Sequence, residues 1–492
     1  MALSKGAISM GKMEKTGKAI VIGGSIAGLL AARVLSDYYT EVLILDKDEL
    51  STEPQDRLGT PHAFHPHRFT TRGKMITERF FPGFENDLVA NGAPSSFNKT
   101  VCNSNQYGSI TGLYQRNDIK FSRANLESVI RKRVQDIPHV HILDRQDVIG
   151  LLPYPDHTAV TGVLIRNRKE PMQVTEATAD LVVDTSGRFS KLPQWLTEMG
   201  YEVPRPDVLK ANIGYSTQRF QVPPQLTELI EKWDVINIAG QPATGTFTGV
   251  FSFIENQVAE MLLYRPGGNY PPTDEKRYRQ AIAELPSPLI AETLEGLEPL
   301  TTIRSYRVPE LYRHRYEQMT RWPSGLLILG DAFCIFDPIF GQGMTVAAIE
   351  AEKLDACLRQ QQVNPQRDFE KQVLICMQAA IEPAWWLNCA TDIQWEGVEY
   401  DGSDSLQGIT FVSRVMSLLL QEATAKQNLP WYGLYWGVNT LSQSPRDIFN
   451  AQTVSEILGT SDEGMQLLAE LQQTHQGMSL EEILDEIIPF KE

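Results

Sequence analysis

The sequence of 492 residues is poor in cysteine, and its five cysteines are scattered: Cys102, Cys334, Cys357, Cys376 and Cys389. Their number is odd and no Cys-x-x-Cys pair occurs, which argues against a disulfide framework and a zinc knuckle. The sequence also lacks an apolar run of about 18 residues, which a transmembrane helix needs, and its start lacks the apolar core of a signal peptide. These absences predict a cytoplasmic protein without a transmembrane segment and leave peripheral membrane contact open.

Basic residues are also in short supply. The chain has 45 Lys and Arg against 61 Asp and Glu, a formal net charge of −16. A protein of this sign is repelled by a polyphosphate backbone, so we expect no nucleic-acid partner. The share of hydrophobic residues, 42%, is typical of a globular protein with a sizeable core. At about 150 residues per domain, the length allows roughly three domain-sized units.

A glycine turn lies near the start of the chain. The apolar stretch Lys18–Ile22 is followed by the turn from Gly23 to Gly28, a helical run, and a second apolar stretch that ends at Asp46. In a dinucleotide-binding motif the glycines allow a sharp turn, close approach of a pyrophosphate and packing of the helix, whose positive end faces the phosphates. An acid at the end of the second strand accepts hydrogen bonds from a ribose. On this motif alone both FAD and NAD fit; the candidate residues are Gly23, Gly24, Ser25, Ile26, Ala27, Gly28, Asp46 and Lys47.

A second glycine segment is more specific. From Leu326 to Met344 the sequence reads LLILGDAFCIFDPIFGQGM, an apolar strand followed by GD, DP and GQG in register. This segment resembles the GD motif of class A flavoprotein monooxygenases, the family of p-hydroxybenzoate hydroxylase, polyprenyl-methoxyphenol hydroxylases and the flavin epoxidases of polyether biosynthesis. The resemblance implies that Asp331 binds the ribityl chain of FAD and that Pro338 lies beside the isoalloxazine. It adds Gly330, Gly341, Gln342, Gly343 and Met344 as cofactor-binding residues, where a helix N-terminus stabilises the reduced flavin.

Three further positions match the same family. The resemblance implies that Arg123, in the stretch FSRANLE, reaches the FAD pyrophosphate and that Val148 meets the adenine. It also brings the turn at Gly187 close to FAD. That turn, from Asp184 to Arg188, departs from the Asp-Gly motif of the classical hydroxylases and is closer to the form in epoxidase-like and halogenase-like relatives. The resemblance implies NADPH or NADH as the electron donor, and this departure bears on how such a donor would reduce the flavin.

Histidines gather in one polar segment. His62, His65 and His67 lie within six residues, but no cysteine or acidic ligand accompanies them, so we predict no metal site. The segment from Arg57 to Gly73 resembles the family's loop beside the flavin, which makes His65, His67 and Arg72 candidates for catalytic side chains. A solvated loop is the alternative interpretation.

The predicted fold is α/β: a three-layer FAD-binding domain of the glutathione-reductase (Rossmann) type, interrupted by a mixed-sheet substrate domain and followed by a helical C-terminal region. We expect the first FAD-binding part at 17–204, with substrate-side strands at about 90–117. The substrate-binding sheet is expected at 205–311, the second FAD-binding part with the GD motif at 312–362, and the helical region at 363–492.

The resemblance implies a FAD-dependent monooxygenase that uses O2, through a flavin C4a-hydroperoxide, to hydroxylate or epoxidise a small molecule. We expect a large lipophilic substrate, because the middle of the chain is rich in apolar and aromatic residues. The alternatives are a flavin-dependent halogenase, although no WxWxIP segment occurs, an isoprenoid double-bond reductase, and a flavin-binding protein without catalysis. The oligomeric state stays open. The apolar candidates for the pocket wall are Phe247, Val250, Phe251, Phe253 and Leu262.

Overall fold

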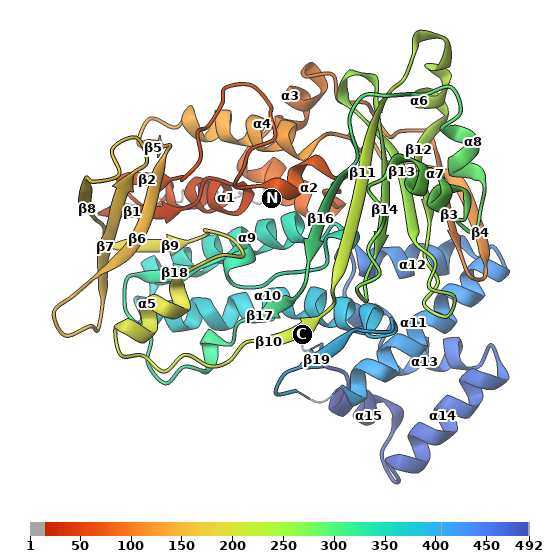
Figure 1. Ribbon diagram of the computed structural model, residues 1–492. Helices are drawn as coiled ribbons and strands as arrows, with labels where there is room; N and C mark the ends of the chain where they lie inside the picture. Colours follow the sequence, from red (N-terminus) through yellow and green to blue (C-terminus); the bar gives the residue numbers. More distant parts are fainter. Residues whose placement is uncertain (1–14, 405, 491–492) are drawn as a thin grey trace, which may run out of the picture.

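A parallel sheet forms the centre of the first part of the molecule. The computed structural model describes residues 15–404 and 406–490. The sheet's strands are almost wholly buried, as in sheets covered on both faces. Its order is β18-β9-β1-β2-β5 (Figure 1), with β1 (Lys18–Ile22), β2 (Glu41–Leu45), β5 (Val140–Leu143), β9 (Leu181–Asp184) and β18 (Leu326–Ile328).

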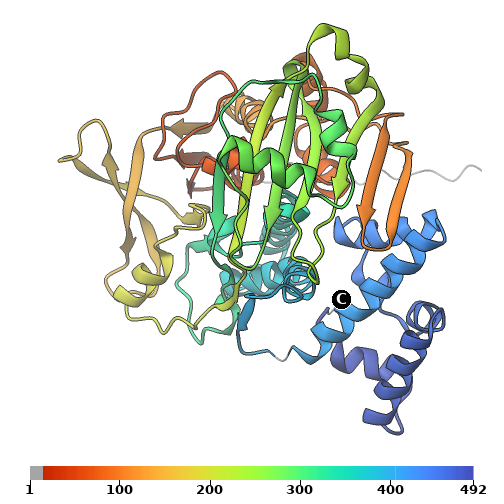
Figure 2. The same ribbon diagram turned by 45° about the vertical axis from the view of Figure 1, so that its right-hand side comes forward.

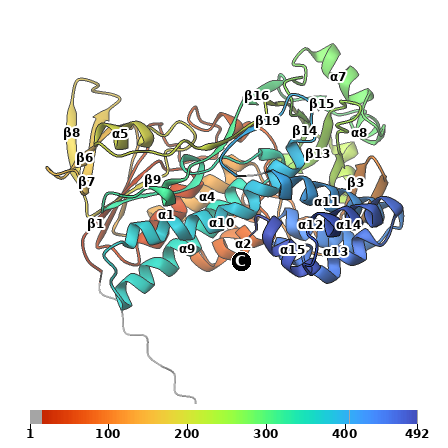
Figure 3. The ribbon, with the colours of Figure 1, turned by 90° about the horizontal axis from the view of Figure 1, so that it is seen from below.

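Helices cover one face of this sheet and an antiparallel meander lies on the other side. The helix α1 contacts both α4 and α9, and Figure 3 shows α10 (Phe369–Asp392) running along α9. The meander contacts the sheet through β7 against β9. These layers confirm the predicted three-layer fold. Their elements are α1 (Ile26–Leu35), α4 (Arg123–Gln135), α9 (Gly343–Val363), β6 (Gln146–Pro153), β7 (Val160–Asn167) and β8 (Val174–Thr178).

The second part is a mixed sheet. Two strands from early in the chain, β3 and β4, complete the edge of the strands from the middle, in the order β15-β11-β14-β13-β12-β3-β4, with β16 on β11. The helices α7 (Glu275–Ala283) and α8 (Leu289–Thr293) lie over one face. The strands are β3 (Thr100–Asn105), β4 (Gly108–Leu113), β11 (Ile213–Gln221), β12 (Trp233–Ile238), β13 (Thr248–Ile254), β14 (Val258–Arg265), β15 (Glu298–Pro299) and β16 (Arg304–Val308).

Alternation along these strands separates the predicted pocket residues. Phe251 and Phe253 are buried in the core beneath α7 and α8, and Phe247 packs against that core. Their assignment to the pocket wall was therefore wrong. Val250 and Leu262 lie on the other face, where they line the cavity described below.

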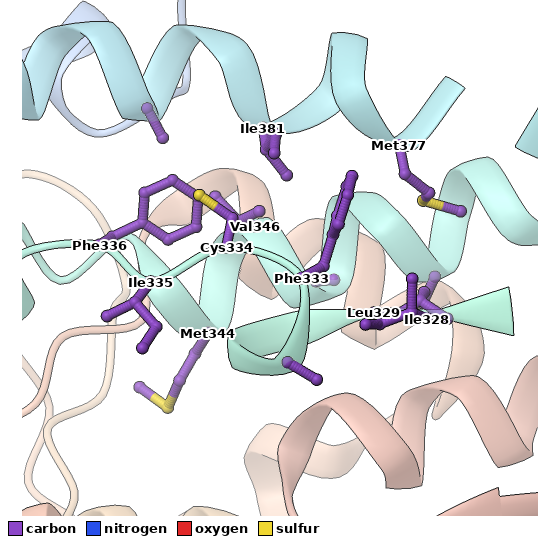
Figure 4. Packing of buried hydrophobic residues seen from close by; sticks show 14 of the residues in the cluster. Ile328, Leu329, Phe333, Cys334, Ile335, Phe336, Met344, Val346, Met377 and Ile381 are labelled. Atoms are coloured by element: carbon purple, nitrogen blue, oxygen red, sulfur yellow. The ribbon is translucent and has the colours of Figure 1, made fainter. Parts of the chain in front are cut away.

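The C-terminal region is helical. The long helix α10 packs along α9, and its Met377 and Ile381 point toward the loop that carries Phe333 and Phe336 (Figure 4). The helix α11 contacts β4, which places the last helices under that edge of the mixed sheet (Figure 2). The helices are α10 (Phe369–Asp392), α11 (Gln407–Ala425), α12 (Leu429–Asn439), α13 (Ala451–Leu458), α14 (Asp462–Thr474) and α15 (Leu480–Ile487).

A small sheet connects the parts. The side chain of Arg313 is fully buried there, bonded to Asp207 and facing the rings of Trp385 and Trp386. Within 15–404 and 406–490, no helix has the length and hydropathy that a membrane crossing requires. The remaining elements are β10 (Asp207–Lys210), β17 (Leu311–Arg313), β19 (Glu399–Asp401), α2 (Thr71–Phe80), α3 (Phe84–Ala90), α5 (Leu192–Glu198) and α6 (Glu228–Lys232).

Candidate functional site

Three turns from distant parts of the chain meet at the carboxyl ends of β1, β9 and β18. At Gly23, where φ is +102°, a Cβ would lie 2.6 Å from the carbonyl oxygen of Thr185. A Cβ on Gly28 would lie 1.9 Å from the carbonyl oxygen of Gly23, and one on Gly330 would lie 2.8 Å from the Cβ of Ala27. The dinucleotide turn, the Thr185 turn and the GD turn therefore touch one another, and glycine is what allows the contact.

The start of α1 offers an anion-binding site. Its first N–H groups have no partners within the helix, its N-cap Ser25 makes no capping bond, and no acidic residue lies in its first turn. Arg123 donates a hydrogen bond from Nη2 to the Ser25 hydroxyl at 2.6 Å. A positive helix end beside a guanidinium fits a pyrophosphate.

A buried charge network that the sequence analysis missed holds this arginine in place. Arg57 donates to the carboxylates of Glu127 and Asp48 at 2.8 and 2.7 Å, and Arg123 donates to Glu127 at 2.8 Å. Burial alone would raise the pKa of Glu127, but Arg123 and Arg57 lower it to about 2. The signal available in the sequence was the spacing of Glu127, one helical turn after Arg123.

Asp46 lies beside the turn, as predicted for the acid of a dinucleotide motif. It is buried, and its carboxylate accepts hydrogen bonds from the backbone N–H groups of Gly24 at 2.7 Å and Asp48 at 2.8 Å. These bonds fix the path of the chain after β2 and still leave acceptor capacity for a ribose hydroxyl. Lys47 follows it, half-buried, and Val148 is buried in β6.

The GD turn is positioned from α9. The N–H of Gly330 donates to Glu350 at 2.8 Å. The Asp331 side chain is exposed to solvent, and desolvation by the surrounding protein raises the pKa of its carboxyl while Arg123 and Arg188 act to lower it. A Cβ built on Gly187 or Gly343 would meet no atom within 4 Å, so both glycines border open room. The residues present therefore fit FAD.

A cavity of about 1170 Å³ adjoins this segment. Pro338 and Gly341 form part of its wall, and His65 and His67 line it as well. Much of the remaining wall comes from the open face of the mixed sheet and from α10, α11 and α12. Among these residues are Tyr215, Val250, Leu262, Tyr264, Leu387, Met416, Tyr435 and Trp436.

The two cavity histidines are held by hydrogen bonds. His65 Nδ1 lies 2.7 Å from the Thr217 hydroxyl, and His67 Nδ1 lies 2.8 Å from the His65 carbonyl oxygen. Burial lowers the pKa of each to about 3, so both rings are neutral at pH 7. Arg72 instead pairs with Glu352 of α9 and is 38% exposed, which places it at the rim. No set of three or more His, Cys, Asp or Glu suited to a metal ion occurs in the described residues.

Gln342 lies within the GQG turn, but its side chain points away from the open room beside Gly343. Fully buried, it donates to the carbonyl oxygen of Asn439 at 2.8 Å and accepts from Asn388 at 2.7 Å. Asn388 in turn accepts from the N–H of Asp337. The side chain of Gln342 therefore connects α9 with α10 and α12, and the backbone of the turn is the part that can face a cofactor.

Comparison with known proteins gives one relative in sequence and several in structure. No family model matches the chain. Protein Rv3254 of Mycobacterium tuberculosis is 31% identical over 395 residues, which cover 77% of this chain and 80% of that protein. The flavoprotein/dehydrogenase from Cytophaga hutchinsonii superposes with a TM-score of 0.61 at 15% identity, covering 93% of this chain and all of that one (100%).

Two further solved structures are similar. The flavin-dependent brominase Bmp2 gives a TM-score of 0.59 at 14% identity, over 94% of this chain and 99% of that chain. PqsL, a probable FAD-dependent monooxygenase from Pseudomonas aeruginosa, gives 0.53 at 14% identity, over 85% of this chain and 99% of that chain. At such identities the likeness shows the fold. The chain has the fold of FAD-dependent monooxygenases and halogenases, as the resemblance to class A flavin monooxygenases implied, and it belongs to the family of Protein Rv3254.

Proposed function

We propose that this protein is a FAD-dependent monooxygenase that transfers one oxygen atom from O2 to a lipophilic small molecule. The observation that carries the proposal is the shared wall of the two sites. Pro338 and Gly341, which the resemblance puts beside the isoalloxazine, also line the large cavity. A substrate bound there would lie against the flavin ring, which is the arrangement that oxygen transfer requires.

The chain's own residues would bind and orient the cofactor. Ser25 with Arg123 would hold the pyrophosphate, Asp331 the ribityl chain, and the backbone from Gly341 to Gly343 the pyrimidine edge. When bound, FAD supplies the activation of O2, a reaction that no protein side chain performs. The mixed sheet and the C-terminal helices would shield a bound substrate from bulk water.

His67 gives the cavity a neutral hydrogen-bond acceptor. Its Nδ1–H donates to the His65 carbonyl oxygen, so the other ring nitrogen, Nε2, is unprotonated. Since burial lowers the pKa of His67 to about 3, the ring keeps this state at neutral pH. We expect it to orient a donor group of the substrate or to accept a proton from it.

Halogenation is the second candidate function, favoured by the similarity to the brominase Bmp2. A lysine does line the cavity, Lys120, but it pairs with Asp234 at 3.2 Å. The chain also lacks the WxWxIP segment of the halogenases. These two features make monooxygenation the better supported reaction.

The test is to incubate the purified protein aerobically with NADPH or NADH and follow flavin bleaching and O2 uptake across a panel of phenols and polyenes. We expect a yellow protein with about one FAD per chain and products that gain one oxygen atom, with or without bromide or chloride. A halogenated product that disappears in Lys120→Met would establish the second candidate instead. A colourless protein that binds NAD but not FAD would refute both.

Asp331→Ala tests the cofactor site itself. The variant loses a charged acceptor for a ribityl hydroxyl, an interaction of about 1.5 to 3 kcal/mol, so FAD should bind more weakly while the fold persists. Arg72→Ala, at the cavity rim, is the matched control and should retain FAD. Unchanged flavin affinity and reduction kinetics in Asp331→Ala would contradict this role.

A further inference from the structure

Two buried carboxyl groups lie together beside the cavity. Asp337 immediately precedes Pro338 and is fully buried, and Asp392 is the last residue of α10 and 1% exposed. The two carboxyl groups interact closely enough to share a hydrogen bond, which forms when one of them is protonated. Of the two, Asp392 lines the cavity.

The surroundings decide which carboxyl group carries the proton. Asp337 accepts hydrogen bonds from the hydroxyls of Tyr215, at 2.8 Å, and Tyr264, and from the N–H of Ile339 at 3.0 Å. Such donors favour the charged form. Burial, and then the charge of Asp337, raise the pKa of Asp392 well above its ordinary range. Asp337 is therefore the carboxylate and Asp392 the neutral acid.

Asp392 is left with an unsatisfied oxygen. Within the described part of the chain, no N–H or O–H group donates to either of its carboxyl oxygens, although both are buried. When its O–H donates to Asp337, its carbonyl oxygen still lacks a donor. A buried acceptor without a donor destabilises the empty site, and a ligand in the cavity that donates a hydrogen bond to it recovers this cost.

We propose that Asp392 is a substrate-binding residue whose carbonyl oxygen accepts a hydrogen bond from a hydroxyl group on an otherwise lipophilic ring. The inference rests on the proposed function, in that it takes the cavity for the substrate site. An anionic substrate is disfavoured here by the charge of Asp337. An ammonium group is disfavoured because Asp337 already has three donors and the adjoining wall, Leu387 and Ala390, is apolar.

Two substitutions separate this role from a structural one. Asn at position 392 mimics the protonated acid, since its amide N–H can donate to Asp337 while its oxygen faces the cavity. Leu has a similar size but offers no acceptor. Thr391→Val, which removes a neighbouring hydroxyl that lines the cavity, is the matched control.

The experiment measures binding of four naphthalene probes to the FAD-reconstituted chain by calorimetry: 2-naphthol, 2-methoxynaphthalene, 2-naphthylmethylamine and 2-naphthoate. We expect 2-naphthol to bind about tenfold more tightly than its methyl ether in the wild type, Asp392→Asn and Thr391→Val. In Asp392→Leu the two should bind equally; if that variant does not fold, Asp392→Ala serves instead.

Three results would overturn the proposal. One is equal binding of naphthol and its ether, or no binding of any probe, in the wild type. Another is an undiminished naphthol preference in the variants that lack the acceptor. The third is a preference for the amine that Asp392→Asn abolishes, which would identify a cation site. The proposed function fails separately: if the chain takes up no flavin, the same calorimetry on the purified chain without FAD can still show the preference for 2-naphthol.

Discussion

Two glycines at the cofactor site are needed for different reasons. At Gly28 a side chain would collide with Gly23 and Thr185, whereas at Gly343 it would enter open room. We therefore expect Gly28→Val to lower the melting temperature and abolish FAD binding together. Gly343→Val should weaken FAD binding and leave the melting temperature of the apoprotein within about 2 °C of the wild type. A substitution into open space of this kind changes the free energy of unfolding by about 0.5 kcal/mol or less.

The measurements are flavin content after purification and thermal unfolding of the apoprotein. Gly433→Ala is the control, because its Cβ would meet nothing within 4 Å and it lies in α12, away from the three turns. A yellow Gly28→Val with wild-type melting would show that Gly28 is not the third glycine of the motif. Full FAD occupancy in Gly343→Val would show that the open room beside it is not the flavin site.

The buried carboxyl of a single residue, Glu350, makes the free energy of unfolding depend on pH. It is fully buried, donors are few around it, and burial raises its pKa to about 8. Its contribution to stability is complete below the pKa of the unfolded chain, about 4.3, and is lost as the pH rises to 8. The unfolded carboxyl ionises over this interval while the folded one keeps its proton, a slope of up to about 1.4 kcal/mol per pH unit.

Glu350→Gln removes this titration and keeps the acceptor for the Gly330 N–H. We expect the variant to gain on the wild type in melting temperature from pH 5 to pH 8, and the difference to level off above pH 8. The two proteins share all their other carboxyl groups, so the pH dependence that those groups contribute cancels in this comparison. Parallel melting curves for the two proteins would contradict the raised pKa.

At the scale of elements, the sequence predicted what periodicity and glycine motifs determine. The helical run expected after the glycine turn is α1, and the apolar stretch Lys18–Ile22 is β1. The sequence did not show which residues of β13 face the cavity. The strand Thr248–Ile254 has apolar residues on both of its faces, so its pattern of Phe and Val does not reveal which face packs against α7.

Apart from the spacing of Arg123 and Glu127 on one helix, the charge network and the acid pair could not be predicted, because their contacts join distant parts of the chain. Arg57 meets Glu127 across 70 positions of sequence, and Asp337 meets Tyr215 across 122. Hydrogen bonds between such distant groups leave no local pattern. Gln342 was predicted as a cofactor-binding residue of its turn, and the direction of its side chain could not be predicted for the same reason: the motif indicates a turn, and the fold decides which way each side chain points.

The contact of Gln342 with α10 and α12 gives a prediction for these elements. Gln342→Leu would leave the Asn388 amide and the Asn439 carbonyl without their partner, at a cost of about 1 to 3 kcal/mol each. We expect a lower melting temperature and faster amide hydrogen exchange in 429–439. The control is Gln372→Leu, an exposed glutamine on α10. Unchanged exchange in that segment would show that α12 is held by its other contacts.

At the scale of the whole molecule, no one part of the chain contains the cavity. His65 and Pro338 come from the FAD-binding part, Leu262 from the mixed sheet, and Trp436 from the C-terminal helices. The last helices carry none of the family motifs, but they are rich in tryptophan and tyrosine, and Tyr435 and Trp436 line the cavity. Removing them would therefore open the substrate site while leaving the glycine turns in place.

The composition of this wall predicts the size and polarity of the substrate. A volume of about 1170 Å³ exceeds what a single-ring acid fills, and each further 100 Å² of apolar surface buried contributes about 2.5 kcal/mol. We expect neutral compounds of three or more rings to bind at least tenfold more tightly than benzoates and to accelerate flavin reduction by NADPH or NADH. Trp436→Ala should weaken the binding of bulky compounds more than that of small ones, because it removes a part of the cavity wall that only the bulky compounds contact. Hydroxylation of small aromatic acids without peroxide leakage, with bulky compounds neither bound nor oxidised, would contradict this preference.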